Sequence, residues 1–515
     1  MRRIASPGGV WHDGHDRFVY DCFPGDWHVA RTTKKEIAAW CGFDLSTTAL
    51  ALGVRSRSGT EAYVHMKIRG GTRWHGQPAF KLELVPKMIL SLLRSLEENG
   101  WQFHKTILSF AVRQHDMVLL GRHGQLLMPA LSWQCNAATD EVEQLRGAGV
   151  ERKVGRIEPR FILPKLAWAL RTQPVMRRNL AQVMTTGDWI AQRLTGKDRL
   201  SSSDAISNGL LDQQTKKLAE TALRKGKLNP KWFPKVVQSG RNVGRVTSRG
   251  NEELEPGWTE VCNILAGSQV IAALGDNHAT GVGCGLAEKD YGTIVISAGT
   301  SGTINRVCPA KVALAGEAAC FEFYQDRMLL MMLPDCCSWY DGFVSRDAGR
   351  YRNHLEQINQ LAGKADLANI RRVLPGAGTG ICPPNWKALK MGEQAASVQT
   401  SIMLELLLLT KKMLAEAPEA GPVERFVLTG GLSQSRFFQQ VFSAGIEFLA
   451  PGARTEISAR KGPLRFQTAA YGGLLNAMRS KDAGATARLC PTRSAADPSA
   501  RSEAFFDYFF RASGL

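Results

Sequence analysis

The chain has 515 residues, of which 44% are hydrophobic and 22% are charged, and it carries a formal net charge of +18. This length exceeds what a single hydrophobic core usually serves, so we expect a soluble globular protein with two domains. The basic charge favours anionic partners such as nucleotide phosphates, but Lys and Arg are dispersed without a long run, which argues against a nucleic-acid-binding protein.

The sequence also argues against a membrane or secreted protein. A membrane-spanning helix needs roughly 20 apolar residues, whereas the best candidate, residues 402–409, is short and interrupted by Glu405. Residues 1–37 lack the apolar stretch of a secretion signal, and we assign them no role. The eleven cysteines are irregularly spaced and include no Cys-x-x-Cys pair. Reduced thiols are therefore expected, and with them a cytoplasmic protein.

The first predicted structural unit begins at residue 38. Residues 38–54 have the pattern of a strand, a tight turn and a second strand, and residues 62–68 predict a third strand. Asp44 stands at the end of the first strand. The turn that follows it contains three hydroxyl side chains, those of Ser46, Thr47 and Thr48.

A helix and a buried strand come next. Apolar residues at helical spacing predict a helix over residues 84–96, and residues 106–112 predict the strand. This strand delivers Gln114 and His115 to its C-terminal end, where polar groups of α/β proteins commonly face a ligand. For His115 a purely structural role is an equally open alternative.

A second acid-and-hydroxyl pattern lies between residues 272 and 306. Its apolar run ends in Asp276, a small-residue segment that can open a helix follows, and residues 293–297 predict a strand that leads into the turn at 299–302. Glycine lets backbone N–H groups approach phosphate oxygens, and a carboxylate can accept a proton from a substrate hydroxyl. The turn alone is also typical of ordinary hairpins.

The remaining elements alternate helices and strands. Two or three amphipathic helices are expected within residues 163–194, an edge strand over 243–246, and a long helix over 395–414. Residues 425–428 predict a strand, followed by a diglycine turn and a helix that starts at 436. A last strand and helix are expected over 454–457 and 467–478. Neither a Walker A loop nor a Gly-x-Gly-x-x-Gly fingerprint is present.

Three strands of this sequence are followed by such turns, at Asp44, at 299–302 and at 430–431. In this order they resemble the sites of the actin-like ATPase superfamily, and specifically of the FGGY carbohydrate kinases. The resemblance runs from about residue 41 to 478. It includes Gln114-His115, the segments Pro129-Ala-Leu-Ser-Trp133 and Pro164-Lys-Leu-Ala-Trp168, Ser203-Asp-Ala205, Gly275-Asp-Asn277 and the Thr-Gly-Gly turn at 429–431.

The resemblance implies an α/β fold of two ribonuclease-H-like (actin-like ATPase) domains flanking a central cleft that holds ATP and Mg²⁺. Residues 38–285 would form the N-terminal, sugar-binding domain and residues 286–480 the C-terminal, ATP-binding domain. Residues 1–37 would be an extension and residues 481–515 a tail.

The resemblance also implies roles for single residues. Asp44 would orient the metal, and Asp276 would be the general base that takes the proton from the sugar hydroxyl. The expected ATP and phosphate contacts are Ser46, Thr47, Thr48, Gly299, Thr300, Ser301, Gly430, Gly431 and Ser435. The expected sugar contacts are Gln114, His115, Trp133, Asp276 and Asn277.

The pairs Gln114-His115 and Asp276-Asn277 are similar to pairs in xylulokinases, which makes a ketopentose such as D-xylulose the first candidate substrate. Departures from the xylulokinase pattern occur at Ser46, Asp116, Cys135 and Ala137. Another ketose or a polyol therefore stays open as the substrate, and so does a non-catalytic sugar or nucleotide sensor of the same fold. A homodimer is also expected from the resemblance.

Overall fold

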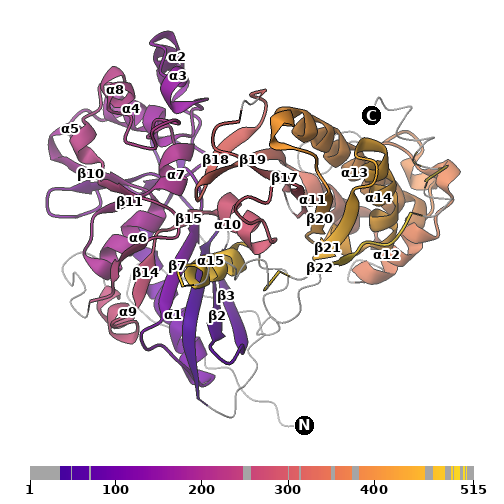
Figure 1. The fold of residues 1–515 in the computed structure, drawn as a ribbon, viewed down its shortest axis with the longest axis horizontal. Coiled ribbons are helices and arrows are strands. Elements are labelled where there is room, and N and C mark those ends of the chain that lie inside the picture. The colour runs from indigo at the N-terminus through magenta and orange to yellow at the C-terminus, as the bar shows by residue number, and fades with distance from the viewer. Residues whose placement is uncertain are drawn as a thin grey trace.

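The computed structural model describes residues 35–506 except 48, 69–70, 248–256, 300, 313–314, 350–353, 374–381, 459–467, 482–488, 491, 499–502 and 505 (Figure 1). Within these residues the chain forms two large sheets that lie side by side, each with its own helices. None of the helices in this part of the chain has both the length and the hydropathy to cross a membrane.

The first large sheet is built from the N-terminal half of the chain. Its strand order is β13-β14-β7-β1-β2-β3, with β15 also paired to β7 and β6 to β1. The strands are β1 (Glu36–Leu45), β2 (Ala49–Ser56), β3 (Glu61–Lys67), β6 (Trp101–Gln102), β7 (Ile107–Val112), β13 (Asn242–Arg245), β14 (Gln269–Ile271) and β15 (Leu274–Gly275).

The second large sheet repeats the same pattern with the C-terminal half. Its order is β18-β19-β17-β16-β20-β21-β22. As β1 does with β2 and β7, β16 pairs antiparallel with the next strand, β17, and parallel with the later strand β20. The strands are β16 (Thr293–Ala298), β17 (Gly302–Cys308), β18 (Ala319–Phe323), β19 (Asp326–Leu333), β20 (Arg425–Thr429), β21 (Arg454–Ser458) and β22 (Thr492–Ser494).

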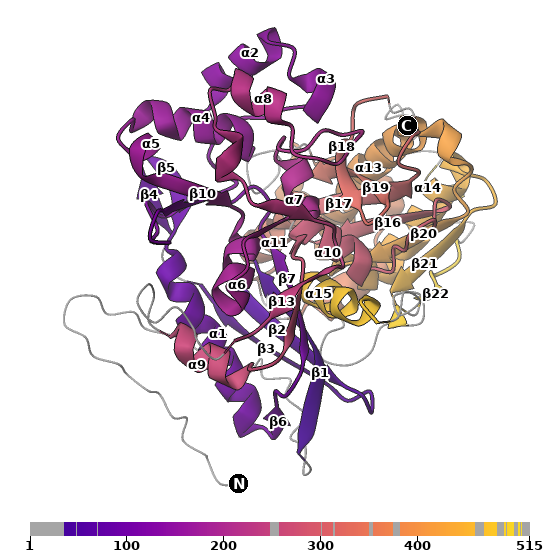
Figure 2. The same ribbon diagram turned by 60° about the vertical axis from the view of Figure 1, so that its left-hand side comes forward.

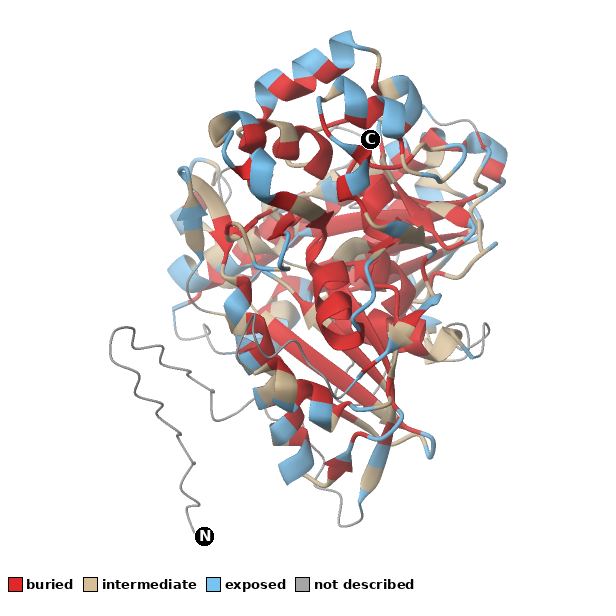
Figure 3. Cartoon of the chain, turned by 90° about the vertical axis from the view of Figure 1, so that its left-hand side faces the viewer, coloured by how far each residue is buried: buried red, intermediate tan, exposed pale blue. Residues whose placement is uncertain are grey.

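Helices of amphipathic sequence cover the sheets and turn their polar faces outward, so that buried residues gather on the strands (Figure 3). In the first half α1 packs on β2 and β3 and α6 packs on β7 and β14, while in the second half α13 packs on β17 and β19. The longer helices are α1 (Val85–Glu98), α4 (Ile162–Thr172), α6 (Thr186–Thr195), α11 (Cys336–Asp347), α12 (Leu355–Gly363), α13 (Met391–Glu416) and α14 (Arg436–Leu449).

Smaller elements lie between β3 and β14 in the chain. They comprise the helices α2 (Thr139–Gly147), α3 (Glu151–Val154), α5 (Met176–Asn179), α7 (Ser202–Ser207), α8 (Glu220–Lys225) and α9 (Trp258–Ile264). Three small sheets accompany them, β4 (Thr72–Trp74) with β5 (Gln77–Phe80) and β9 (Ala130–Leu131), β8 (Val118–Gly121) with β10 (Leu180–Met184), and β11 (Arg199–Ser201) with β12 (Lys235–Val237). The helices predicted within residues 163–194 are present as α4, α5 and α6, and β10 lies between α5 and α6 and pairs with β8.

Two helices cross between the halves. Helix α10 (Asp276–Gly283) follows the first sheet, while α15 (Thr468–Arg479), from the end of the chain, packs on β1 and β7 of that first sheet. The two views agree that α15 lies beside α10 and β7 (Figures 1 and 2). Glycine makes this contact possible, since a Cβ on Gly472 would lie 1.7 Å from the Ala279 carbonyl oxygen. The two halves are thus joined by a backbone-to-backbone helix pair.

Candidate active site

Two aspartates stand at the carboxyl ends of strands that flank β7. In the ladder Asp44 of β1 lies opposite Ala111, and Gly275 of β15 lies opposite the next residue, Val112. Asp276 follows directly as the first residue of α10. Since neighbouring strands are about 5 Å apart, the two acids approach each other across the end of β7. The sequence prediction that both acids end strands is therefore confirmed.

The surroundings of the two acids perturb both carboxyl groups. Burial, together with the negative charge of Asp276, raises the pKa of Asp44 to about 7. Burial raises the pKa of Asp276 to about 6, against the hydrogen bonds donated by backbone N–H groups of Asn277 and Gln114. A carboxyl group with a pKa near 6 suits a general base at neutral pH.

Asp44 also has a free oxygen. Its Oδ1 atom is buried and accepts no hydrogen bond among the described residues. A buried carboxylate oxygen without a donor is costly, and a cation would satisfy it. No group of three or more His, Cys, Asp or Glu side chains in the described ranges could enclose a metal. The unpaired Asp44 oxygen fits Mg²⁺, which needs only one or two carboxylates when phosphates and water supply its other ligands.

Gln114 links the end of β7 to α10. Its Oε1 accepts a hydrogen bond from Asn277 Nδ2, 2.7 Å away, and its Nε2 is buried without a partner among the described residues. The side chain fits only because residue 275 is glycine, since a Cβ there would lie 2.3 Å from Gln114 Cγ. The unpaired amide N–H is a donor suited to a substrate hydroxyl, beside the proposed base.

His115 has a different environment. It has a left-handed backbone (φ 70°), stacks on Phe161 at 4.8 Å, and its Nδ1 lies 3.1 Å from Asn208 Oδ1. Burial and the charges of Arg160 and Lys165 lower the pKa of His115 to about 3, so the ring is neutral at pH 7. These contacts support the structural alternative and leave sugar binding by His115 a prediction.

Trp133 connects the sugar side of the site to the first hydroxyl turn. Its indole N–H donates to Thr47 Oγ1 over 3.1 Å, and its backbone N–H donates to Asp116 Oδ1 over 3.1 Å. Asp116 is fully buried and forms an ion pair with Arg113, with 2.7 Å between Oδ2 and Nε. The departure from the family pattern at Asp116 therefore anchors the loop that holds Trp133.

The hydroxyl side chains of the predicted phosphate-binding turns differ in their surroundings. Thr48 and Thr300 lie outside the described residues. The Ser46 hydroxyl closes the β1–β2 turn by donating to the Ala49 carbonyl and accepting from the Ala49 N–H. Its hydroxyl is therefore engaged locally, whereas Thr47 is exposed.

In the second half, the turns after β16 and β20 lie against each other. These strands pair in parallel, and a Cβ on Gly430 would lie 2.4 Å from the Ala298 carbonyl oxygen. Around Gly431, by contrast, no atom of the described residues lies within 4 Å of where a Cβ would be, so this side of the turn leaves room for a ligand. Two turns predicted to contact ATP thus form one surface. One contains Gly299 and Ser301, and the other contains Gly430 and Gly431.

Ser435 has a structural role instead. It is buried, its hydroxyl caps α14 by accepting from the Phe438 N–H, and it donates to Gln399 Oε1 over 2.9 Å. The hydroxyl predicted to bind ATP is thus already used by the helix. A Ser directly before a helical pattern is an N-cap signal, which favours this role from the sequence as well.

Two buried residues near the site have no assigned role in the sequence analysis. Lys165 is fully buried and donates from Nζ to the carbonyls of His115 and Ser132, which stabilises the loops that present Gln114 and Trp133. Asp204 is fully buried with both oxygens unpaired among the described residues. Burial and the charges of Asp188 and Asp276 raise the pKa of Asp204 well above its usual range.

Comparisons with known proteins find relatives for part of the sequence and for the fold. Residues 73–283 match the family model for the N-terminal domain of the FGGY family of carbohydrate kinases. The chain is 30% identical over 230 residues to the xylulose kinase of Streptomyces rubiginosus, covering 43% of this chain and 45% of that protein. In such alignments the chain spans about half the length of the curated relatives it matches.

Solved structures match over nearly the whole chain. The xylulose kinase of Rhodospirillum rubrum has a TM-score of 0.75 at 16% identity, covering 92% of this chain and 97% of that one. The gluconate kinase of Lactobacillus acidophilus has a TM-score of 0.74 at 17% identity, covering 93% and 96%. The predicted α/β fold is thus confirmed, and so is the resemblance: residues 73–283 match the family model for the N-terminal domain of the FGGY carbohydrate kinases, and the chain has the two-domain actin-like ATPase fold of the solved kinase structures.

Proposed function

We propose that this chain is an ATP-dependent sugar kinase that transfers the γ-phosphate of ATP to a hydroxyl of a ketose, with a ketopentose such as D-xylulose as the first candidate. The observation that carries the proposal is the meeting of Asp44 and Asp276 at the end of β7, one with a buried unpaired oxygen and the other with a pKa near 6. Xylulose kinases among the relatives support the choice of sugar.

In the proposed reaction Gln114 and Asn277 orient the sugar, and Asp276 accepts the proton of the attacking hydroxyl. Asp44 would hold Mg²⁺, which neutralises phosphate charge when bound. The exposed Thr47 hydroxyl accepts from Trp133 and so keeps its own proton for a phosphate oxygen. Gly299, Ser301, Gly430 and Gly431 would contact ATP through their backbone N–H groups, and ATP contacts by Thr48 and Thr300 stay predictions.

The division at residues 38–285 and 286–480, a homodimer and a cytoplasmic location remain parts of this proposal. The cysteines in the described ranges are all free thiols, which supports a reducing compartment. The net charge gives no reason to add a nucleic-acid partner, because the predicted substrates are themselves anions or small sugars.

The test is ADP release from Mg-ATP with a panel of ketopentoses, ketohexoses, heptuloses and polyols, run beside Asp276→Asn. A sugar that gives turnover in the wild type and at most about a hundredth of it in the variant supports the proposal, because general-base catalysis typically contributes 10²–10⁴-fold. Turnover that survives the substitution would remove Asp276 from its role. ATP binding without turnover on any sugar would favour the sensor alternative.

A further inference from the structure

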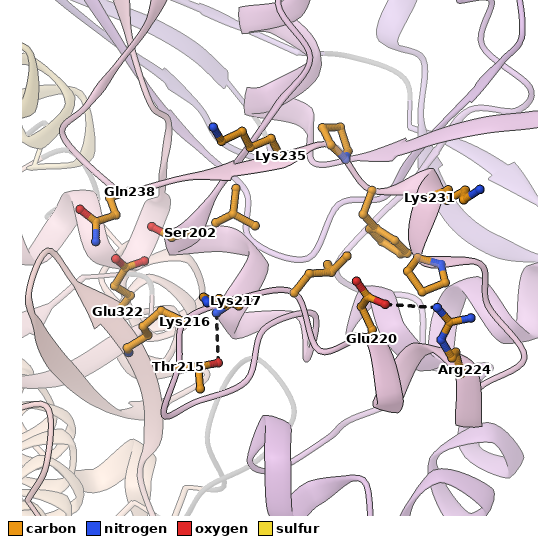
Figure 4. Close-up of a pocket in the computed structure, with 15 residues that line it drawn as sticks. Ser202, Thr215, Lys216, Lys217, Glu220, Arg224, Lys231, Lys235, Gln238 and Glu322 are labelled. Atoms are coloured by element: carbon orange, nitrogen blue, oxygen red, sulfur yellow. Dashed lines mark hydrogen bonds and ion pairs between the residues drawn. The ribbon is translucent and has the colours of Figure 1, made fainter.

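A cavity of about 630 Å³ lies apart from the residues of the proposed active site. Residues between α7 and β13 form most of its wall, and Glu322 of β18 completes it from the second sheet (Figure 4). Its middle is apolar, with Leu218, Val236 and Phe233. A ligand in this cavity would therefore touch both halves of the molecule.

Basic side chains predominate around the cavity. Five basic residues line it, and no pattern in the sequence predicts that they meet. They are Lys216, Lys217, Arg224, Lys231 and Lys235. Arg224 is neutralised by Glu220 across 3.2 Å. That leaves four lysines against Glu322, an excess that favours an anionic occupant.

The inner end of the cavity holds two polar groups without partners. Glu322 is 2% exposed and its Oε2 accepts no hydrogen bond among the described residues. Lys216 Nζ is shielded from solvent and likewise has no partner there. The charge of Glu322 acts to raise the pKa of Lys216, and the charge of Lys216 acts to lower the pKa of Glu322. No ion pair within 4.0 Å joins the two side chains in the described part of the chain. Unsatisfied groups of this kind are rare in a folded protein and suit a bound polar molecule.

The backbone contributes to this arrangement. Lys216 has a left-handed conformation, with φ at 58°. The Asp212 carboxylate holds the loop by accepting the backbone N–H groups of Gln214 and Thr215, each over 2.9 Å. Lys216 thus lines the cavity from a loop whose backbone is fixed by hydrogen bonds, and left-handed residues of this kind cluster at binding sites.

We propose that this cavity is a second binding site, for a sugar phosphate, built across the two halves of the chain. The hydroxyls would donate to Glu322 and accept from Lys216 at the inner end, where Ser202 and Gln238 are also gathered (Figure 4). The phosphate would face Lys217 and Lys235, which are exposed. Inorganic phosphate leaves Glu322 unpaired, and a free sugar leaves the lysines without an anion, so each part alone should bind weakly.

The cavity has a short structural connection to Asp276. Ser202 lines the cavity, and the next residue of α7, Ser203, accepts a hydrogen bond from the Gly275 N–H over 3.3 Å. Ser203 also lies 3.0 Å from His278 Nδ1 in α10. Helix α7 also packs against β18. A ligand in the cavity would therefore affect the position of Asp276, the proposed base. Binding itself does not depend on the kinase proposal.

The test is isothermal titration calorimetry of the full chain, without ATP, with glucose 6-phosphate, ribose 5-phosphate and glycerol 3-phosphate. Inorganic phosphate, free ribose and glutamate serve as comparison ligands. The cavity variants are Lys217→Ala with Lys235→Ala, on the surface, and the isosteric Glu322→Gln. Lys87→Ala and Lys364→Ala, at exposed positions elsewhere, are matched controls.

We expect at least one sugar phosphate to bind, and to bind about tenfold or more weakly in each cavity variant, since a hydrogen bond to a charged group is lost. The two control variants and Asp276→Asn should keep wild-type affinity. No binding by any of the three sugar phosphates, unchanged binding in the cavity variants, or loss in Asp276→Asn alone would each overturn the proposal. Tighter binding of glutamate or inorganic phosphate would overturn the ligand class.

Discussion

Asp276 is close enough to Asp44 for its negative charge to raise the pKa of the Asp44 carboxyl. The two acids stand at the ends of β1 and β15, with only β7 between them. Interacting carboxyl groups titrate as a pair, so the apparent pKa values belong to the site as a whole.

The first prediction concerns pH and turnover. Because a base must be deprotonated to act, kcat/KM should fall as the pH drops through the apparent pKa of Asp276, about 6 in the free protein. The measurement is kcat/KM from pH 5 to 9 at saturating Mg²⁺ with the best sugar. A profile that stays flat down to pH 5 would contradict the assignment, and Asp276→Asn should lack the acidic limb in whatever activity it retains.

The second prediction concerns pH and stability. The pKa of Asp44 is about 7 in the folded chain, whereas its ordinary value is 3.8. Between about pH 4 and pH 7 the Asp44 carboxyl is therefore protonated in the folded chain and ionised in the unfolded chain. Stability from this group is therefore lost as the pH rises through that window. Asp44→Asn should raise the free energy of unfolding by on the order of a few kcal/mol at pH 8, with the gain vanishing near pH 4.

Chemical denaturation at both pH values in the absence of Mg²⁺ measures this effect, with the exposed Asp140→Asn as control. Mg-ATP should then stabilise the wild type more than Asp44→Asn, because the ligand binds only the folded protein. Equal stabilisation of the two proteins by Mg-ATP would argue against a metal contact by Asp44.

The third prediction compares two adjacent glycines. Gly430→Ala would place a Cβ 2.4 Å from the Ala298 carbonyl oxygen at a residue with φ of 93°, so the β16 and β20 turns must separate. We expect a loss of about 1–3 kcal/mol in stability and weaker ATP binding. Gly431→Ala, whose Cβ has no atom within 4 Å, should fold normally. Thermal denaturation and ATP titration distinguish the two, and equal stability of both variants would refute the argument.

The fourth prediction concerns Trp133→Phe, which keeps an aromatic ring but removes the N–H donated to Thr47. One neutral hydrogen bond is worth about 0.5–1.5 kcal/mol, so kcat/KM should fall roughly 2- to 10-fold. Trp74→Phe, at a tryptophan that packs edge-on against Trp168, is the control and should leave kcat/KM unchanged. Steady-state kinetics with ATP varied decide the matter; an unaffected Trp133→Phe would show that the Thr47 hydroxyl needs no orienting donor.

Periodic sequence predicted the large elements well. Alternating or continuous apolar runs located β1, β7, β16 and β20, and the helical spacing over 395–414 located the core of α13, which extends over Met391–Glu416. The same patterns failed for β9 and β10, which are short and owe their existence to pairing with distant β5 and β8. Such pairing leaves no local periodicity to detect.

Some residues of the candidate site follow from local sequence patterns, and others depend on contacts with distant segments. Asp44, Asp276 and the glycine turns were predictable because a strand end followed by Gly, Ser or Thr is a local pattern. The roles of Lys165 and Asp204 were not, because they arise from burial against segments far away in the chain. The hydroxyl of Ser435 accepts the N-cap hydrogen bond of α14, which the sequence signals locally, and an ATP contact by Ser435 stays a prediction.

The crossing of α15 has a consequence for how the protein is made. Strand β1 leaves the ribosome early, yet Ala470, Leu474 and Leu475, which complete the apolar cluster that includes Ala51 and Ala111, are synthesised some 400 residues later. Until then the first sheet presents an uncovered apolar face, a state that favours aggregation or chaperone capture. Residues 38–285 expressed alone should share that fate, and a separately supplied second half should rescue them.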